Sequence, residues 1–234
     1  MQLTVRDVTR FFTVSESTVT RWIKRRGLPA HSVGGQYRFH RAELLEWATA
    51  NKLPVSLQMF DQMDAESQPA PKLSESLEAG GVFYGLGDTD KDSAIRSLVQ
   101  VLPLPEENDR ELVLRLFLAR EAAASTAIGD GIAIPHVRNP MVLRIAQPHV
   151  TLGFLEHPVD FGALDGKPVH VLFSIISPTN RSHLQLLSRL SFALRDDGFN
   201  KAVTRHAAKD DIMRKLRHVE GGMATAPSDS GKVV

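Results

Sequence analysis

Apolar residues near the start of the chain recur at the three-to-four-residue spacing of helices. The first run contains Val5, Val8, Phe11 and Phe12. Thr4 and Asp7 stand at its start with capping-box-like spacing, with Asp in place of the usual Glu. A second run predicts a helix from the N-cap Ser15 to about Arg26, because glycine and proline follow it. The pattern therefore predicts two short helices separated by a tight turn.

The next segment has the pattern of a hairpin followed by another helix. Gly34-Gly35 supplies the positive φ angles of a hairpin turn, so residues 33–39 are expected to form a two-stranded wing that carries Arg38. A third helix is expected to open at His40 or Arg41. The apolar residues expected to close the core of this unit are Leu44, Leu45 and Trp47.

From about residue 73 the pattern changes to strands mixed with helices. Helices are expected at 73–79, 90–101, 106–121 and 179–194, and strands at 132–134, 150–154 and 169–176. The residues between the two parts are polar and small and include two prolines, which is typical of a linker. The domains predicted are thus 1–54 and 73–220, joined by a linker at 55–72 and followed by a disordered tail at 221–234.

Composition narrows the class of protein. Apolar residues make up 42% and charged residues 24% of the 234 residues, the balance of an ordinary soluble globular protein. The absence of cysteine excludes disulfides, thiolate metal sites and cysteine nucleophiles. The start has no signal-peptide pattern, and no apolar run approaches the roughly 18 residues needed to cross a bilayer. We therefore expect a cytoplasmic protein with no membrane segment.

Charge is distributed unevenly along the chain. Residues 1–54 carry nine Lys or Arg against four Asp or Glu, whereas the remaining residues have a net charge of −4. Such a split suggests that the first part meets a polyanion. A solvated face that happens to be basic explains the charge equally well, so charge alone does not decide.

Two histidines stand at the ends of predicted elements. A glycine turn precedes an alternating strand that Pro135 terminates, which leaves His136 at a strand end facing a crevice. An imidazole with a reference pKa near ~6.5 is substantially neutral, and hence nucleophilic, at cytoplasmic pH. His183 falls in the first turn of the helix at 179–194. Taken alone, His136 is more often a loop residue and His183 a residue that packs above leucines.

The first 50 residues resemble the winged helix of the MerR and excisionase-like families. The run SESTVTRWIKRRGLPA and the wing GGQYRF carry the resemblance, in the family's order and spacing. In that family the second helix reads base edges and the wing touches the backbone. The resemblance implies base contacts by Ser17, Thr18, Arg21 and Arg25 and phosphate contacts by Lys24, Arg26 and Arg38. The alternative is that these side chains form a solvated face and the module binds only protein.

The second part resembles enzyme IIA of the sugar phosphotransferase system, in its fructose/mannitol and nitrogen-regulatory branch. The motifs REAAASTAIGDGIAIPH, FGALDGKPVHVLF and SHLQLLSRL carry the resemblance, which covers about 150 residues. It implies an α/β fold with a mixed sheet flanked by helices. It also implies that His136 accepts a phosphoryl group, with His183 and Arg120 stabilising that group. Ala127 and Val137-Arg138 depart from the glycines common at these positions, and the second departure could alter partner preference.

Together these features predict a phosphorylation-responsive regulator that binds double-stranded DNA. An HPr-type histidine phosphocarrier, or its nitrogen-branch counterpart, is the expected phosphoryl donor, and neither a cofactor nor a metal is expected. The alternative is a phosphoryl-relay component whose first module serves only assembly. In either case the chain carries a phosphoryl group rather than turning over a metabolite, and a homodimer is left open. Coupling of the two functions requires an interdomain or dimer contact near His136, because exposed charges more than about 8 Å apart interact weakly.

Overall fold

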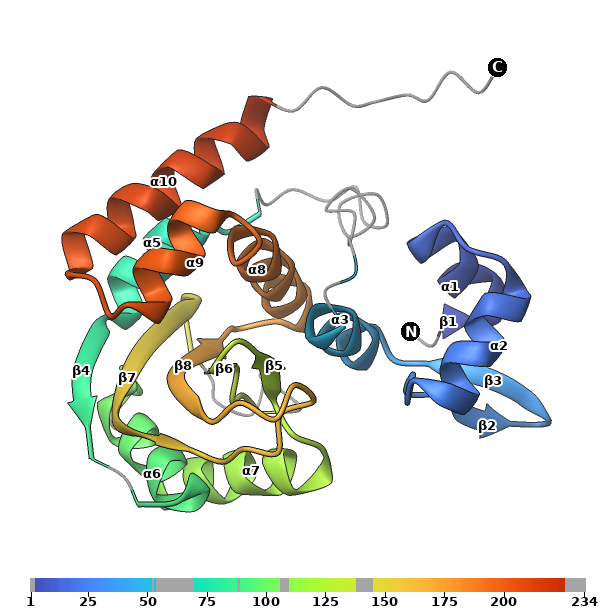
Figure 1. Ribbon diagram of the computed structural model, residues 1–234, viewed down its shortest axis with the longest axis horizontal. Helices are drawn as coiled ribbons and strands as arrows, with labels where there is room; N and C mark the ends of the chain where they lie inside the picture. The colour runs from blue at the N-terminus through green and yellow to red at the C-terminus, as the bar shows by residue number, and fades with distance from the viewer. Residues whose placement is uncertain are drawn as a thin grey trace.

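The computed structural model describes residues 3–51, 53, 70–87, 89–105, 110–137 and 145–225. It has an N-terminal module and a larger C-terminal domain, and Figure 1 shows helix α3 lying between them. The predicted linker at 55–72 and the predicted tail fall largely outside the described residues.

The N-terminal module forms the helices and the wing that the sequence predicts. Its elements are β1 (Leu3–Thr4), α1 (Val5–Phe12), α2 (Glu16–Arg25), β2 (His31–Val33), β3 (Gln36–Phe39) and α3 (Arg41–Ala50). The capping box at Thr4 and Asp7 is present, and Ser15 caps α2 through its side chain. Gly34 and Gly35 adopt the positive φ angles expected of the hairpin turn.

One strand of the module was not predicted from the sequence. β1 pairs antiparallel with β3, which gives a three-stranded sheet in the order β1-β3-β2. A strand of two residues is too short to produce an alternating pattern, so only its pairing with β3 reveals it.

The C-terminal domain is a mixed five-stranded sheet covered by helices on both faces. Its strands are β4 (Val82–Leu86), β5 (Ala127–Gly129), β6 (Ile132–Ala133), β7 (His149–Val159) and β8 (Val169–Ile176). Its helices are α5 (Leu73–Gly80), α6 (Lys91–Val101), α7 (Arg110–Ala123), α8 (Asn180–Ala193), α9 (Asp197–Thr204) and α10 (Lys209–Thr225). The strand order is β4-β7-β8-β6-β5, with parallel and antiparallel pairs. The predicted fold class, a mixed sheet flanked by helices, is confirmed.

The central strand β8 shows why its sequence reads as one continuous apolar run. Val171, Phe173 and Ile175 face a core shared with α5, α8, α9 and α10, whereas Leu172 and Ile176 face a core shared with α6 and α7. Because successive side chains of a strand point to opposite faces, a strand buried on both faces is apolar throughout.

Two expectations are wrong in detail. The tail was expected to lose structure at Gly221, but α10 continues through Gly221 and Gly222 to Thr225. Leu45 was expected in the core of the N-terminal module, but it is buried in the core of the C-terminal domain. Leu45 stands about 100° around α3 from Leu44, so the two side chains leave the helix on different faces.

Helix α3 therefore belongs to both parts of the molecule. Leu44, Trp47 and Ala48 pack in the core of the N-terminal module. On the face toward the C-terminal domain, the Thr49 hydroxyl lies 2.5 Å from that of Ser191 on α8. Among the described residues no helix is long and apolar enough to cross a membrane.

Candidate functional site

His136 lies just beyond the end of β6, as the sequence predicts. β6 pairs parallel with β8, and Pro135 follows it, so the chain leaves the sheet at this point. The His136 side chain is 3% exposed, and its Nδ1 lies 2.8 Å from the carbonyl oxygen of Ile134. A carbonyl only accepts hydrogen bonds, so Nδ1 carries a proton and Nε2 is the ring nitrogen aimed away from the strand.

A buried carboxylate that sequence reasoning missed holds this segment in place. Glu121, at the end of α7, is 3% exposed and accepts hydrogen bonds from the Thr126 backbone N–H at 2.9 Å and its hydroxyl at 2.6 Å. The Thr126 carbonyl in turn accepts the Ile134 N–H at 3.0 Å. Glu121 thus anchors the hairpin that carries His136. Its place beside Arg120 in the RE motif was the available signal.

His183 comes from the first turn of α8 and meets His136 as predicted. Thr179 caps this helix in a capping box with Ser182, which fixes where the first turn begins. The two imidazole rings have centroids 5.2 Å apart. Burial, reinforced by the charges of His136 and Arg120, lowers the pKa of His183 to about 3. His183 is therefore neutral near pH 7, and its Nδ1 has no hydrogen-bond partner within the described part of the chain.

Arg120 also reaches this site, from the last turn of α7. Its side chain is largely buried, and one Nη group donates a hydrogen bond to the Ala124 carbonyl at 2.8 Å. The other Nη group is paired with the carboxylate of Glu46. The three predicted residues of the C-terminal domain therefore converge on one place, where a residue of the N-terminal module joins them.

Glu46 was not predicted as a site residue. It lies on α3, and its Oε1 is 2.9 Å from His136 Nε2 while its other oxygen pairs with Arg120. Burial raises the pKa of Glu46, but the charge and hydrogen bond of His136 and the charge of Arg120 outweigh it and bring the pKa below its usual range. Glu46 is thus a carboxylate. Nothing in the local sequence of α3 indicates a partner 90 positions away.

The four side chains line a cavity of about 1070 Å³ between the N-terminal module and the C-terminal domain. Leu164, from the loop before β8, lies at the same cavity and is 78% exposed. Two departures from the family motif lie close by: Ala127 and Val137 are both buried, whereas Arg138 falls outside the described residues.

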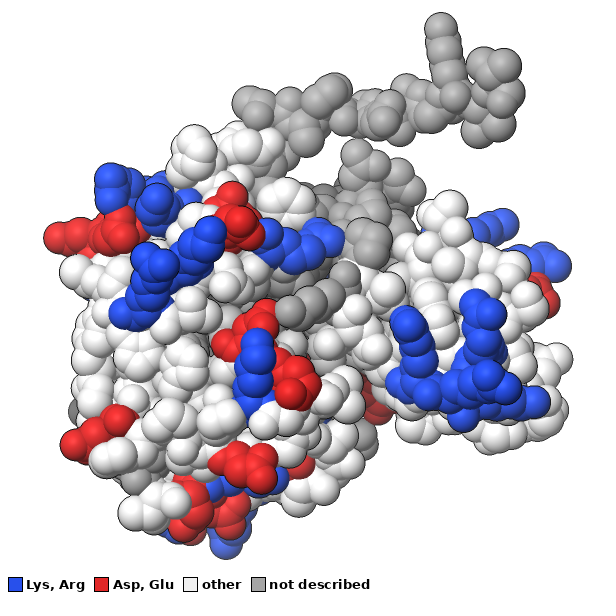
Figure 2. All heavy atoms as spheres, viewed as in Figure 1, with Lys and Arg blue, Asp and Glu red and all other residues white. Residues whose placement is uncertain are grey.

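The residues predicted to contact DNA lie mostly on one exposed surface of the N-terminal module. Arg21, Lys24 and Arg25 are exposed on α2. Figure 2 shows Lys and Arg side chains gathered over this module. Ser17 and Thr18 lie at the start of the same helix, where their hydroxyls are 2.8 and 3.0 Å from that of the N-cap serine.

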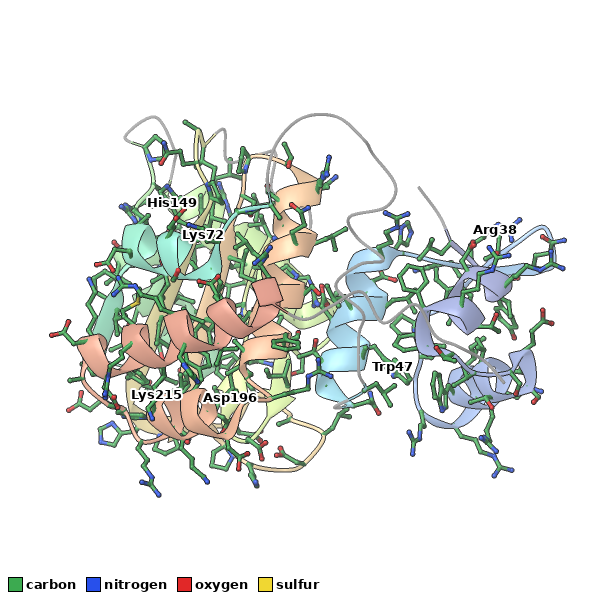
Figure 3. The ribbon with its side chains drawn as sticks, turned by 90° about the horizontal axis from the view of Figure 1, so that it is seen from above. Arg38, Trp47, Lys72, His149, Asp196 and Lys215 are labelled. Carbon is green, nitrogen blue, oxygen red and sulfur yellow. The ribbon has the colours of Figure 1, made fainter. Side chains whose placement is uncertain are left out.

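The two remaining predicted phosphate contacts lie apart from each other. Arg38 is on β3, where its guanidinium donates to Gln36 at 2.9 Å, and Figure 3 shows it on the side of the module away from the C-terminal domain. Arg26 instead lines the interdomain cavity, and its carbonyl accepts a hydrogen bond from Trp47 Nε1 at 2.8 Å. Arg26 is exposed and, unlike the other predicted cations, lines this cavity.

Comparison with known proteins matches both parts of the chain. Residues 75–219 match the family described as phosphoenolpyruvate-dependent sugar phosphotransferase system, EIIA 2, and residues 3–52 match a helix-turn-helix domain. The chain is similar to a nitrogen regulatory protein from Bradyrhizobium diazoefficiens, 33% identical over 148 residues, covering 62% of this chain and 86% of that protein. It is also 33% identical over 145 residues to a phosphotransferase system fructose-specific EIIABC component from Bacillus subtilis, and it spans only 22% of that protein.

A solved structure supports the same likeness. The crystal structure of the nitrogen regulatory protein IIA-Ntr from Neisseria meningitidis superposes with a TM-score of 0.54 at 25% identity, covering 62% of this chain and 98% of that one. The matched 62% of this chain is about as long as the C-terminal domain.

Proposed function

Because the chain belongs to the phosphoenolpyruvate-dependent sugar phosphotransferase system EIIA 2 family, we propose that it accepts a phosphoryl group on Nε2 of His136 from an HPr-type phosphocarrier. We propose further that its helix-turn-helix module binds duplex DNA, so that the protein is a phosphorylation-responsive regulator in the cytoplasm.

The observation that carries the first part is the arrangement around His136. The hydrogen bond from Nδ1 to Ile134 holds the ring with Nε2 facing the Glu46 carboxylate, which also pairs with Arg120, and the His183 ring lies beside it. Transfer between two histidines breaks the N–P bond on the carrier as a bond to Nε2 forms, and the carrier's imidazole leaves with the electron pair. Such a transfer depends on positioning and charge stabilisation by the protein more than on covalent catalysis. The Arg120 guanidinium and a neutral ring N–H of His183 are suited to hold the phosphoryl oxygens.

Intact-mass measurement tests this assignment. Incubation of the full chain with enzyme I, a phosphocarrier and phosphoenolpyruvate is expected to add one acid-labile phosphoryl group. His136→Ala is expected to abolish the addition, and His183→Ala to slow it without abolishing it, because Arg120 remains. Undiminished phosphorylation of the His136→Ala protein would exclude His136 as the acceptor.

The DNA-binding part is supported by the exposed cations on α2 and the wing. A helix with Arg21 and Arg25 on its free surface is suited to a major groove, where arginine pairs with guanine edges. Arg38 on the wing is placed to meet a phosphate, so Arg38→Ala should reduce the log–log salt slope of binding by about one unit. Fluorescence anisotropy with duplex DNA measures both affinity and slope.

The alternative function is a phosphoryl relay in which the N-terminal module serves only assembly. The packing of α3 against the C-terminal domain is the observation that favours it, because that packing is itself an assembly contact. If the full chain shows no affinity for duplex DNA at low salt, the relay is the better description.

A further inference from the structure

The surface of α3 that faces the C-terminal domain is built as a docking surface. Leu45 is 2% exposed in the core of that domain, and the Thr49 hydroxyl contacts that of Ser191. Between them, Glu46 reaches the two groups that the proposed function assigns to the phosphoryl group, Arg120 and Nε2 of His136. An apolar anchor, a hydroxyl contact and a charged contact thus lie on one side of one helix.

The Glu46 carboxylate makes the contacts that a phosphoryl group on His136 would make. Both groups are anions that present oxygen acceptors, and an arginine guanidinium pairs with either one. The hydrogen bond from Nε2 also follows the direction along which a bond from Nε2 to phosphorus would form. The carboxylate and the phosphoryl group therefore cannot occupy the site together.

The docked arrangement also leaves His136 unable to attack. Its Nδ1 faces a carbonyl oxygen at 2.8 Å and its Nε2 faces a carboxylate oxygen at 2.9 Å. The Glu46 oxygen therefore stands at the position from which a phosphorus atom would approach Nε2. A nucleophilic nitrogen must reach the phosphorus directly, so Nε2 can attack only when the Glu46 contact opens.

We propose that Glu46 is an internal stand-in for the phosphoryl group, so that docking of α3 and phosphorylation of His136 exclude each other and phosphorylation releases the N-terminal module. The proposal rests on the proposed phosphorylation of His136 and adds the means by which it reaches the DNA-binding module.

The steps follow from geometry and charge. A donor protein must bring its phosphohistidine in line with Nε2, but α3 covers that approach, and a cavity of about 1070 Å³ is far too small for a folded carrier. The helix must therefore leave before transfer. After transfer, Arg120 holds phosphoryl oxygens in place of the carboxylate. The phosphoryl group carries a charge of about −1.5 to −2 near pH 7, which repels Glu46 and opposes redocking.

The first test measures the rate of His136 phosphorylation in the full chain. Glu46→Gln keeps the shape of the side chain but removes its charge, so the open fraction rises and the rate is expected to increase by about 10- to 100-fold. Glu43→Gln is the matched control, because Glu43 lies one turn earlier on α3 and pairs with His31 inside its own module. Equal rates for Glu46→Gln, the control and the wild type would overturn the proposal.

The second test locks the docked state covalently. The chain has no cysteine, and the Thr49 and Ser191 hydroxyls are 2.5 Å apart, so Thr49→Cys with Ser191→Cys places the only two thiols at the α3–α8 contact. The oxidised, crosslinked chain is expected to resist phosphorylation, and a reductant is expected to restore it. Chain phosphorylated beforehand is expected to crosslink poorly. The proposal would be overturned if the unphosphorylated chain failed to crosslink. It would also be overturned if the oxidised and the reduced chain were phosphorylated at the same rate.

The two proposals fail in different ways. If the reduced double-cysteine chain and the wild type both take up no phosphoryl group, the assignment of His136 fails, and with it any release by phosphorylation. If both are phosphorylated on His136 but the crosslink makes no difference, phosphoryl acceptance stands and only the role of Glu46 fails.

Discussion

The titration of His183 should make the free energy of unfolding depend on pH. The His183→Gln substitution should remove this contribution. His183 is 4% exposed, and burial, with the charges of His136 and Arg120, lowers its pKa from 6.5 to about 3. Between these two pH values the unfolded chain binds a proton that the folded chain excludes. The stabilisation is therefore complete above pH 6.5 and declines as the pH falls toward 3.

The size of the effect follows from the two pKa values. Well below pH 6.5, each pH unit costs about 1.4 kcal/mol in the free energy of unfolding for this single proton. From pH 8 to pH 5 the loss due to His183 amounts to about 2 kcal/mol. In the His183→Gln variant this site no longer titrates, so its stability should fall by about 2 kcal/mol less than that of the wild type over the same interval.

Urea denaturation at pH 8 and pH 5, followed by far-ultraviolet circular dichroism, measures this difference. Fluorescence is unsuited to it, because both tryptophans, Trp22 and Trp47, lie in the N-terminal module. His157→Gln is the control, since His157 is exposed on β7 and lies outside the site. If the wild type and His183→Gln lose the same free energy between pH 8 and pH 5, His183 is not held neutral by burial.

Three further substitutions test other parts of the structure. Gly80→Ala would place a Cβ 2.1 Å from the Val150 carbonyl oxygen, so α5 must shift from β7 and the free energy of unfolding should fall by about 1–3 kcal/mol in urea titration. Glu121→Ala leaves the Thr126 donors without their acceptor in the interior, which should cost about 2–3 kcal/mol and slow phosphoryl transfer in the intact-mass assay. Arg25→Ala should weaken binding to a preferred duplex by about 1–3 kcal/mol in anisotropy and relax the sequence preference of the protein. If the wild type and the variant bind every duplex with the same affinity, Arg25 does not read bases.

Local structure was largely predictable because it depends on neighbouring residues. The caps at Thr4 and Ser15, the paired glycines of the wing and the continuous apolar run of β8 each produce their element through local geometry or through burial on both faces. The motif around His136 likewise predicted an imidazole at a strand end. The structure places it beside His183 and Arg120, as the family resemblance implied.

The contact between the two parts was not predictable from local pattern. A helix with Leu44, Leu45, Trp47 and Ala48 gives no indication of which residue faces which partner, and Leu45 was assigned to the wrong core for that reason. Glu46 is an ordinary acidic residue in sequence, and only packing brings its carboxylate to His136.

The sequence by itself thus determined many of the elements, the fold class and the histidine expected to carry the chemistry, because helix caps, turns and strand alternation act over a few residues. The tertiary structure alone decided what faces that histidine. Contacts between residues 46, 120 and 136 depend on how separate elements pack, and packing is selected by the burial of whole faces rather than by any local signal. The Glu46 contact supplies the interdomain link near His136 that coupling between phosphorylation and DNA binding would require.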